Sequence, residues 1–111
     1  MGGREGGITE TSFHMKPIVL RADARADLLE IQSWYESEKE GLGSVFLSSV
    51  TAKLTSIQEN PRLYPKSSQN TRRALLGTFP YAVLYFDERD EIVVFAVWHT
   101  SREPDSWQER I

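Results

Sequence analysis

The dipeptide Asn60-Pro61 constrains the fold most, because a helical pattern ends there and a strand pattern follows. Proline cannot continue a helix, and it disfavours helical geometry in the residue before it. The helix that ends here carries apolar residues at nearly regular i, i+4 spacing, at Leu42, Phe46, Val50, Leu54 and Ile57. We therefore expect the helices of this chain to precede most of its sheet.

An earlier helix is expected to begin at Asp23, as its capping residue, and to end near Lys39. Its apolar residues follow helical spacing, among them Leu28, Ile31 and Tyr35. Gly41 and Gly43 then interrupt the pattern before the second helix begins. Two amphipathic helices joined by so short a break should form an antiparallel hairpin.

Four segments have the composition of strands, at residues 16–21, 72–79, 81–86 and 92–99. The acidic connection at residues 87–90 suits a tight hairpin between the last two strands, and the polar residues 61–71 are typical of a loop. The expected fold class is α+β in the order β-α-α-β-β-β, with a helix hairpin packed on one face of a small antiparallel sheet. The other face of the sheet is expected to stay open.

Both ends of the chain carry signals of their own. The first 14 residues are rich in Gly and show no periodicity, so we expect residues 1–15 to be a flexible extension, native or added by cloning. The folded domain is then expected to span residues 16–111. Pro104 should stop the last strand and leave residues 105–111 for a final helical turn.

Composition excludes several classes of protein. The 111 residues suffice for one domain with its own core, and the lack of cysteine excludes disulfides and thiolate metal sites. No apolar run approaches the ~20 residues that span a bilayer, so we expect a cytoplasmic protein without membrane contact. His14 and His99 lie far apart in the sequence, and no glycine motif for phosphates follows a strand. We therefore expect no metal, no cofactor and no small-molecule substrate.

The charges are unevenly distributed. A formal net charge of −3 argues against a general polyanion binder. Residues 60–86 nevertheless contain no Asp or Glu, and they carry the cations Arg62, Lys66, Arg72 and Arg73. This basic sector is either an ordinary solvated loop or a surface that steers a negatively charged partner.

Short motifs follow one another in a fixed order along the chain. They are Ala24-x-x-Asp27-Leu28, Tyr35, Gly41-Leu42-Gly43 with Phe46, Ile57 with Asn60-Pro61, Tyr64-Pro65, Arg73-x-Leu75-Leu76, Phe79-Pro80-Tyr81 and Val97-x-His99-x-x-Arg102-x-Pro104-x-x-Trp107. In their order and spacing, over about residues 16–110, the chain resembles the RelE/ParE superfamily of toxins from type II toxin–antitoxin modules. The resemblance implies the β-α-α-β-β-β fold and a cognate antitoxin whose C-terminal segment covers the working surface.

The superfamily divides by target, so the resemblance implies one of two activities. RelE-like toxins are ribosome-dependent mRNA endonucleases, whereas ParE-like toxins inhibit DNA gyrase and have no attributed nuclease chemistry. RelE-like toxins carry an arginine after the first Tyr of a Tyr-Arg-x-x-Tyr strand, and Ala82 takes that place in residues 81–85. A methyl group cannot stabilise a phosphorane, and this chain is acidic. We therefore expect a ParE-like, plasmid-stabilisation-type toxin that acts by binding gyrase and is not an enzyme.

The alternative is a ribosome-dependent mRNA endonuclease with His99, Arg73 and Arg102 as its catalytic residues. Imidazole titrates near neutral pH, so His99 is suited to act as an acid or a base. A third interpretation is a degenerate member that only binds its antitoxin and co-represses the operon.

The residues expected to bind the target are Arg72, Arg73, His99, Arg102 and Trp107. The first two are adjacent on a strand, so only one of them can point at the open face. The others also have structural interpretations. His99 could bond a neighbouring backbone group, Arg102 could pair with Glu103 or Asp105, and Trp107 could pack the tail onto the sheet.

Overall fold

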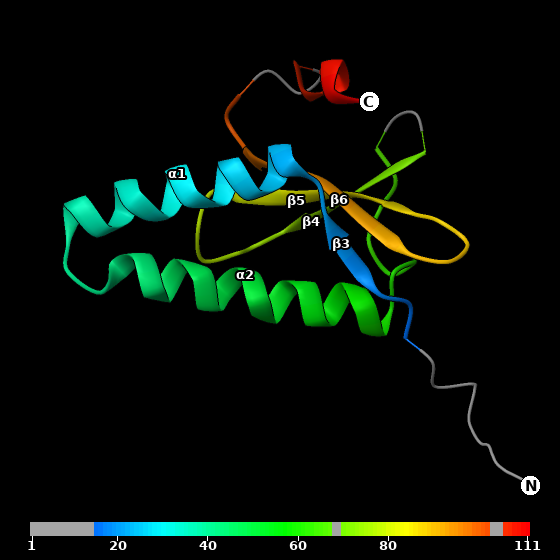
Figure 1. Cartoon of the computed structure of the whole chain (residues 1–111), viewed down its shortest axis with the longest axis horizontal. Coiled ribbons are helices and arrows are strands. Elements are labelled where there is room, and N and C mark those ends of the chain that lie inside the picture. Colours follow the sequence, from blue (N-terminus) through cyan, green and yellow to red (C-terminus); the bar gives the residue numbers. More distant parts are fainter. Residues whose placement is uncertain (1–14, 68–69, 103–105) are drawn as a thin grey trace, which may run out of the picture.

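The computed structural model describes residues 15–67, 70–102 and 106–111. Helices α1 (Ala22–Glu38) and α2 (Leu42–Glu59) form a hairpin beside a four-stranded sheet (Figure 1). The other elements are β3 (Ile18–Leu20), β4 (Thr71–Leu75), β5 (Tyr81–Asp87), β6 (Ile92–His99) and the 3-10 helix η1 (Ser106–Arg110). The α+β class and the β-α-α-β-β-β order are confirmed. The expected extension at residues 1–15 lies outside the described residues, apart from Met15.

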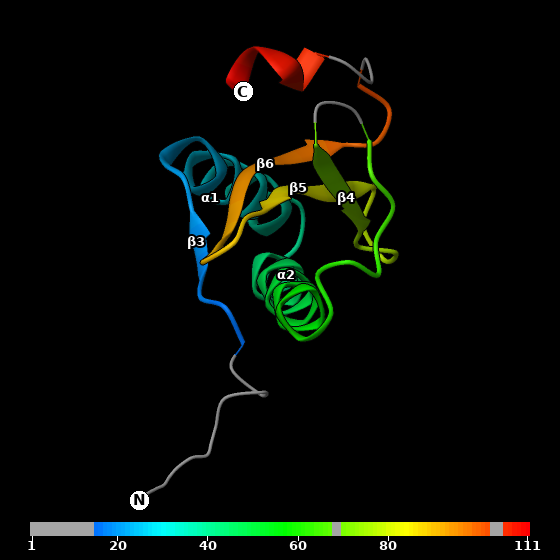
Figure 2. The ribbon, with the colours of Figure 1, turned by 90° about the vertical axis from the view of Figure 1, so that its right-hand side faces the viewer.

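The strands lie in the order β3-β6-β5-β4, with β3 and β4 at the two edges (Figure 2). β4, β5 and β6 pair antiparallel, but β3 runs parallel to β6, with Val19 opposite Val93. The expectation of a wholly antiparallel sheet is therefore wrong at this edge. Both helices and two strands separate β3 from β6 in the sequence, and a connection of this length permits parallel pairing.

Two element boundaries differ from the expected ones. β4 ends at Leu75 and not at Phe79, because Gly77 adopts a φ of +90° that only glycine adopts readily and turns the chain. Helix α1 begins after Arg21, whose backbone is extended, so Asp23 lies in the first turn and is not the capping residue. The chain enters the helix directly from β3, and the Arg21 N–H is bonded to the Val94 carbonyl. Asp23 still favours the helix start through the helix dipole.

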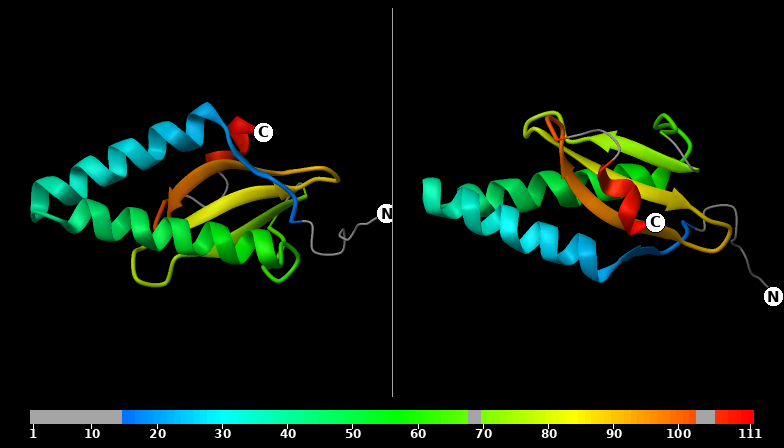
Figure 3. Two further views of the ribbon diagram at one scale, coloured as in Figure 1. Left: turned by 60° about the horizontal axis from the view of Figure 1, so that its bottom comes forward. Right: turned by 90° about the horizontal axis from the view of Figure 1, so that it is seen from above.

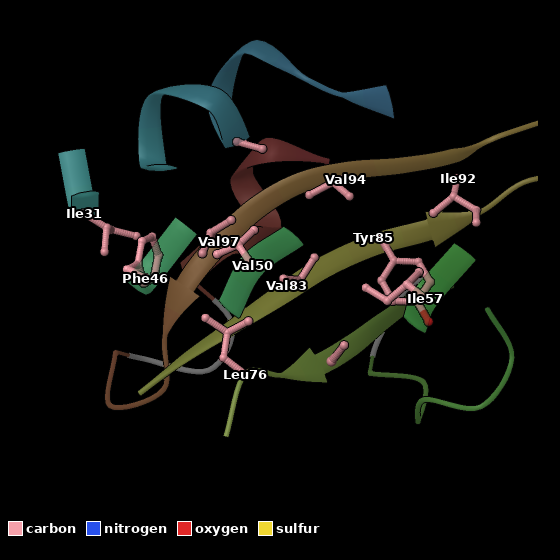
Figure 4. Packing of buried hydrophobic residues seen from close by; sticks show 12 residues of the cluster. Ile31, Phe46, Val50, Ile57, Leu76, Val83, Tyr85, Ile92, Val94 and Val97 are labelled. Atoms are coloured by element: carbon pink, nitrogen blue, oxygen red, sulfur yellow. The ribbon is translucent and has the colours of Figure 1, made fainter. Parts of the chain in front are cut away.

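The main core lies between the helix hairpin and the sheet (Figure 4). Phe46 of α2 is fully buried at the centre of an aromatic cluster. Its ring stacks on Tyr35 of α1 at 5.5 Å between centroids and meets the edges of Phe79 at 5.3 Å and Tyr81 at 5.8 Å. This cluster joins both helices to the turn before β5.

The opposite face of the sheet holds a second, smaller core. Its buried residues are Ala82, Leu84, Phe95, Ala96, Trp98 and Trp107. Trp107 comes from η1, is 3% exposed and lies with its ring 5.7 Å from that of Phe95. Figure 3 shows η1 beside β6. The chain's own tail therefore covers part of the face that was expected to be open.

A bulge in β6 decides which of its side chains reach each face. Leu84 lies opposite Ala96 and Tyr85 opposite Val94, so Phe95 is an extra residue without a partner across the ladder. Such a bulge shifts the alternation of the side chains by one. After the bulge, Val97 packs in the main core and Trp98 in the second core, and His99 lies opposite Tyr81 with its ring 5.0 Å from the Tyr81 ring.

Tyr85 gives a pH-dependent test of the main core. Its side chain is fully buried, its hydroxyl donates to the Pro61 carbonyl at 2.6 Å, and burial raises its pKa from 10.0 to about 12. The protonated phenol therefore favours the folded state. Its contribution is complete below pH 10 and is lost as the pH rises through about 12.

The Tyr85→Phe variant is expected to lose about 1 kcal/mol of unfolding free energy at neutral pH, because one hydrogen bond is removed. Above pH 10 the wild type should lose stability faster than the variant, so that the difference shrinks. Urea unfolding at several pH values measures both. An equal alkaline loss in the two proteins would contradict the assignment.

Candidate functional site

A cavity of about 160 Å³ opens on the sheet face opposite the helices, and we call it the sheet-face pocket. Its lining residues are Ser67, Arg73, Ala82, Leu84, Trp98, His99, Thr100, Arg102 and Trp107. Four of the five residues expected from the sequence to bind the target meet here. They come from β4, from the end of β6 and from the tail.

Arg72 is the expected site residue that lies elsewhere. Its Nη1 donates to the Tyr64 carbonyl at 2.7 Å and more weakly to the Arg62 carbonyl at 3.4 Å. The side chain therefore anchors the loop after α2. Arg73 is exposed, lies opposite Leu84 of β5 and lines the pocket. Only one of the two arginines thus reaches this face, as strand alternation requires.

His99 ends β6 and is half-buried. Its Nδ1 lies 3.0 Å from the Ser101 backbone nitrogen and 2.7 Å from the Ser101 Oγ. A backbone N–H can only donate, so Nδ1 is an acceptor and the neutral ring carries its hydrogen on Nε2. His99 therefore does bond a neighbouring backbone group, which was one of its two expected roles.

Arg102 is exposed and lies over the Trp98 ring, with its Cζ 3.7 Å from the centroid of the indole. Its backbone N–H donates to the His99 carbonyl at 3.1 Å. The stack and the turn fix this guanidinium at the rim of the pocket. Its other expected partners, Glu103 and Asp105, lie outside the described residues.

The tail is fastened by an ion pair between Asp27 of α1 and Arg110 of η1, which we call the tail clamp. The guanidinium donates to both carboxylate oxygens, at 2.6 and 3.0 Å, and this hydrogen bonding raises the pKa of Arg110. The same Asp27 carboxylate accepts the Val97 N–H at 2.9 Å. Arg21 donates to the Arg110 carbonyl at 2.7 Å. The clamp therefore ties η1 to α1, β6 and the residue that follows β3.

The tail clamp and Trp107 hold the residues that line the pocket in place. Arg110 also lies 4.9 Å from the Trp98 ring, which carries Arg102. Trp107 was expected either to pack the tail or to touch the target, and its burial shows the packing role. A direct target contact by Trp107 stays a prediction that would require the tail to move.

A larger hollow of about 540 Å³ lies between α1 and the ends of β5 and β6. Trp34, which is 56% exposed, lines it together with Tyr35 and Tyr81. Burial raises the pKa of Tyr81, and so do Tyr35 and Glu30 nearby. His99 and Arg102 line both this hollow and the sheet-face pocket, so the two form neighbouring parts of one surface.

The described residues form no metal centre and no membrane-spanning helix. Within them, no three metal-ligating side chains come close enough together to hold an ion. No helix in the same part of the chain is long and apolar enough to cross a membrane.

The arrangement of elements defines a known class of toxin fold. The chain matches a chain of the chromosomal ParDE toxin–antitoxin system from P. aeruginosa with a TM-score of 0.68 and 17% identity, over 79% of this chain and 99% of that one. It matches the isolated E. coli RelE toxin with a TM-score of 0.56 and 18% identity, over 85% and 93% of the two chains. The curated proteins contain no match to the sequence.

A family model places the chain within this class. The model is described as the ParE toxin of the type II toxin–antitoxin system parDE, and it matches residues 18–104. This chain therefore belongs to the ParE toxin family of the RelE/ParE superfamily, as the motifs in its sequence predicted. The match includes Asp27, Arg73, His99 and Arg102, but it ends before Trp107 and Arg110.

Proposed function

We propose that this chain is a toxin that inhibits DNA gyrase by binding it in the cytoplasm and that a cognate antitoxin neutralises it. Membership of a type II toxin–antitoxin family supports the toxin role and the antitoxin partner. The choice of gyrase depends on the chemistry of the sheet-face pocket, whose exposed cations Arg73 and Arg102 would contribute to the target-binding surface.

The observation that carries the proposal is the state of the His99 ring. Cleavage of RNA by its own 2′-hydroxyl requires a group that accepts the hydroxyl proton. The lone pair of Nδ1 is already occupied by the Ser101 N–H, and Nε2 carries the hydrogen. No carboxylate is among the described residues that line the pocket, and Ala82 contributes only a methyl group. This arrangement supports a pocket that binds its target and does not cleave it.

One observation favours the nuclease as a second candidate. All three residues that such an enzyme would use line the pocket, and the His99 ring also packs against Tyr81, 5.0 Å away between ring centroids. Two guanidiniums could stabilise a phosphorane. The nuclease would require His99 to release Ser101 when the ribosome and mRNA bind.

Replacing His99 with alanine separates the two candidates. We expect the His99→Ala variant to keep most of its toxicity, because binding does not depend on proton transfer. For the nuclease, loss of the general acid or base would reduce cleavage by about 100- to 10,000-fold. Growth inhibition after induction measures the effect, with the melting temperature and antitoxin binding as controls for folding. Complete detoxification of a well-folded variant would contradict the gyrase proposal.

Induced cells give a second test of the target. Gyrase inhibition predicts filamentation and DNA-damage signalling while translation continues. An immediate fall in translation with cut transcripts would favour the nuclease instead. The antitoxin has its own test, because co-expression with the small open reading frame beside this gene should yield a co-purifying complex. A toxin that purified alone would contradict that part of the proposal.

A further inference from the structure

We propose that the hollow of about 540 Å³ beside α1 takes an arginine side chain from a segment of a partner protein, between the Glu30 carboxylate and the Trp34 ring. The inference goes beyond the proposed function and does not depend on gyrase as the target. It depends on the aromatic rings of the hollow, on a carboxylate without a counter-ion, and on the way this chain binds its own Arg110.

Four aromatic rings line the hollow in a row, each nearly perpendicular to the next. Trp34 meets Tyr35 at 5.1 Å between ring centroids and 78°, and Tyr81 meets Tyr35 at 6.4 Å and 76°. On its other side Tyr81 meets His99 at 5.0 Å and 79°. The faces of such rings attract cations, those of tryptophan most strongly. Trp34 is 56% exposed, so a ligand from outside can reach its ring.

The Glu30 carboxylate gives the hollow a negative charge without a counter-ion. Glu30 is exposed and lies one turn after Asp27 and one turn before Trp34, so all three share one side of α1. Within residues 15–67, 70–102 and 106–111 it forms no ion pair, and residues 68–69 and 103–105 contain no Arg or Lys. Burial raises the pKa of Tyr81, and the charge of Glu30 raises it further. The carboxylate therefore lies close to the aromatic rings.

The other two charged side chains of the hollow do not fill this role. Asp27 already holds the Arg110 guanidinium with both of its oxygens. Arg102 lines the hollow from the turn after β6, where its guanidinium lies over the Trp98 ring, and it forms no ion pair with Glu30. We therefore expect a cationic ligand at the α1 side of the hollow.

The chain itself shows how such a site binds arginine. Arg110 donates to both oxygens of Asp27 on α1 at 2.6 and 3.0 Å, and its Cζ lies 4.9 Å from the centroid of the Trp98 ring. A planar guanidinium suits this pairing, because it binds a carboxylate through two bonds and packs on an aromatic face. Glu30 and Trp34 repeat the pair of carboxylate and indole one turn further along α1, and no described guanidinium lies between them.

The size and the floor of the hollow favour a peptide segment over a free small cation. A volume of about 540 Å³ lies within the range of ligand sites, ~300–1,000 Å³, and exceeds what one guanidinium fills. The floor includes Ile31 and Val97, which are 8% and 4% exposed. An apolar side chain next to the arginine would cover this floor. An exposed tryptophan beside a hollow is also typical of protein contacts.

The test uses the purified full-length chain in solution NMR, with the Trp34 indole and the Tyr81 ring signals as reporters. The probes are the peptide acetyl-Arg-Leu-amide, the same peptide with citrulline, Lys or Glu in place of Arg, and free arginine. Citrulline keeps the shape of arginine and lacks its charge. We expect saturable shifts with the arginine peptide and about fivefold weaker binding of the citrulline peptide. The lysine peptide should also bind more weakly, because it lacks the planar fork, and the glutamate peptide should not bind.

Two variants test the groups that hold the guanidinium. Glu30→Gln and Trp34→Ala should each weaken binding of the arginine peptide about fivefold. Both side chains are exposed, so the melting temperature should stay close to that of the wild type. Glu38→Gln is the matched control, because it removes an exposed carboxylate from the same helix outside the hollow. We expect this variant to bind as the wild type does.

The proposal is overturned if the arginine peptide gives no saturable shift of the two reporters, or if the citrulline or glutamate peptide binds as tightly. Equal weakening by Glu38→Gln and Glu30→Gln would also overturn it. A lysine peptide that binds as tightly would overturn the assignment to arginine, and free arginine that binds as tightly would overturn the assignment to a protein segment. Because no gyrase enters the experiment, its outcome is independent of the proposed function.

Discussion

The Asp27→Ala variant is expected to lose about 3 kcal/mol of unfolding free energy and most of its toxicity. The Asp27 side chain is only 13% exposed, and it accepts two bonds from Arg110 and one from the Val97 N–H. Removing the carboxylate leaves a half-buried guanidinium and a backbone donor without partners. It also frees η1, so that Trp107 no longer covers the second core and Trp98 no longer supports Arg102 in its present position.

Asp23→Ala is the matched control for this prediction. Asp23 lies one turn earlier on α1, is 44% exposed, and approaches the Nε of the same Arg110 at 3.8 Å. An exposed pair of this kind contributes about 0–1 kcal/mol. Urea unfolding and growth inhibition measure both variants. Equal effects of the two substitutions would show that the tail clamp does not hold the site.

The Phe46→Ala variant is expected to lose about 3–5 kcal/mol, the largest effect on stability that we predict for a single side chain. Phe46 is fully buried and contacts the rings of Tyr35, Phe79 and Tyr81. Its removal leaves a cavity where the helix hairpin meets the turn before β5. A domain of this size has a total stability of about 5–15 kcal/mol, so the variant is expected to be partly unfolded at 37 °C.

Val45→Ala provides the comparison, because Val45 precedes Phe46 on α2 but is 55% exposed. We expect it to cost about 0.5 kcal/mol or less. Chemical unfolding followed by circular dichroism measures both variants. A Phe46→Ala protein as stable as Val45→Ala would contradict the position of Phe46 at the centre of the core.

Local patterns predicted the helices well. The i, i+4 repeat of α2 reflects one buried stripe, and Pro61 forces an end that lies within a residue of the expected one. The order of strands was also readable from composition. The parallel direction of β3 could not be predicted from composition, because an apolar run of three residues carries no information about its partner strand. Gly77 could have been recognised as the end of β4, since a glycine followed by Thr-Phe-Pro is typical of a turn.

The site was only partly visible in the sequence. His99 and Arg102 lie three residues apart, so their proximity follows from chain connectivity, and the family motifs added Arg73. The tail clamp could not be predicted, because Asp27 and Arg110 are 83 positions apart and each looks like an ordinary surface charge. The occupied Nδ1 of His99 depends on the turn geometry at Ser101, and no residue pattern encodes that geometry. These two features decide what the pocket can do.

A supercoiling assay with purified gyrase, run beside a cleavage assay on mRNA-programmed ribosomes, tests directly whether gyrase is the target. We expect that this protein blocks supercoiling, that the cognate antitoxin restores it, and that the mRNA stays intact at the same toxin concentration. Cut mRNA in the presence of fully active gyrase would contradict it.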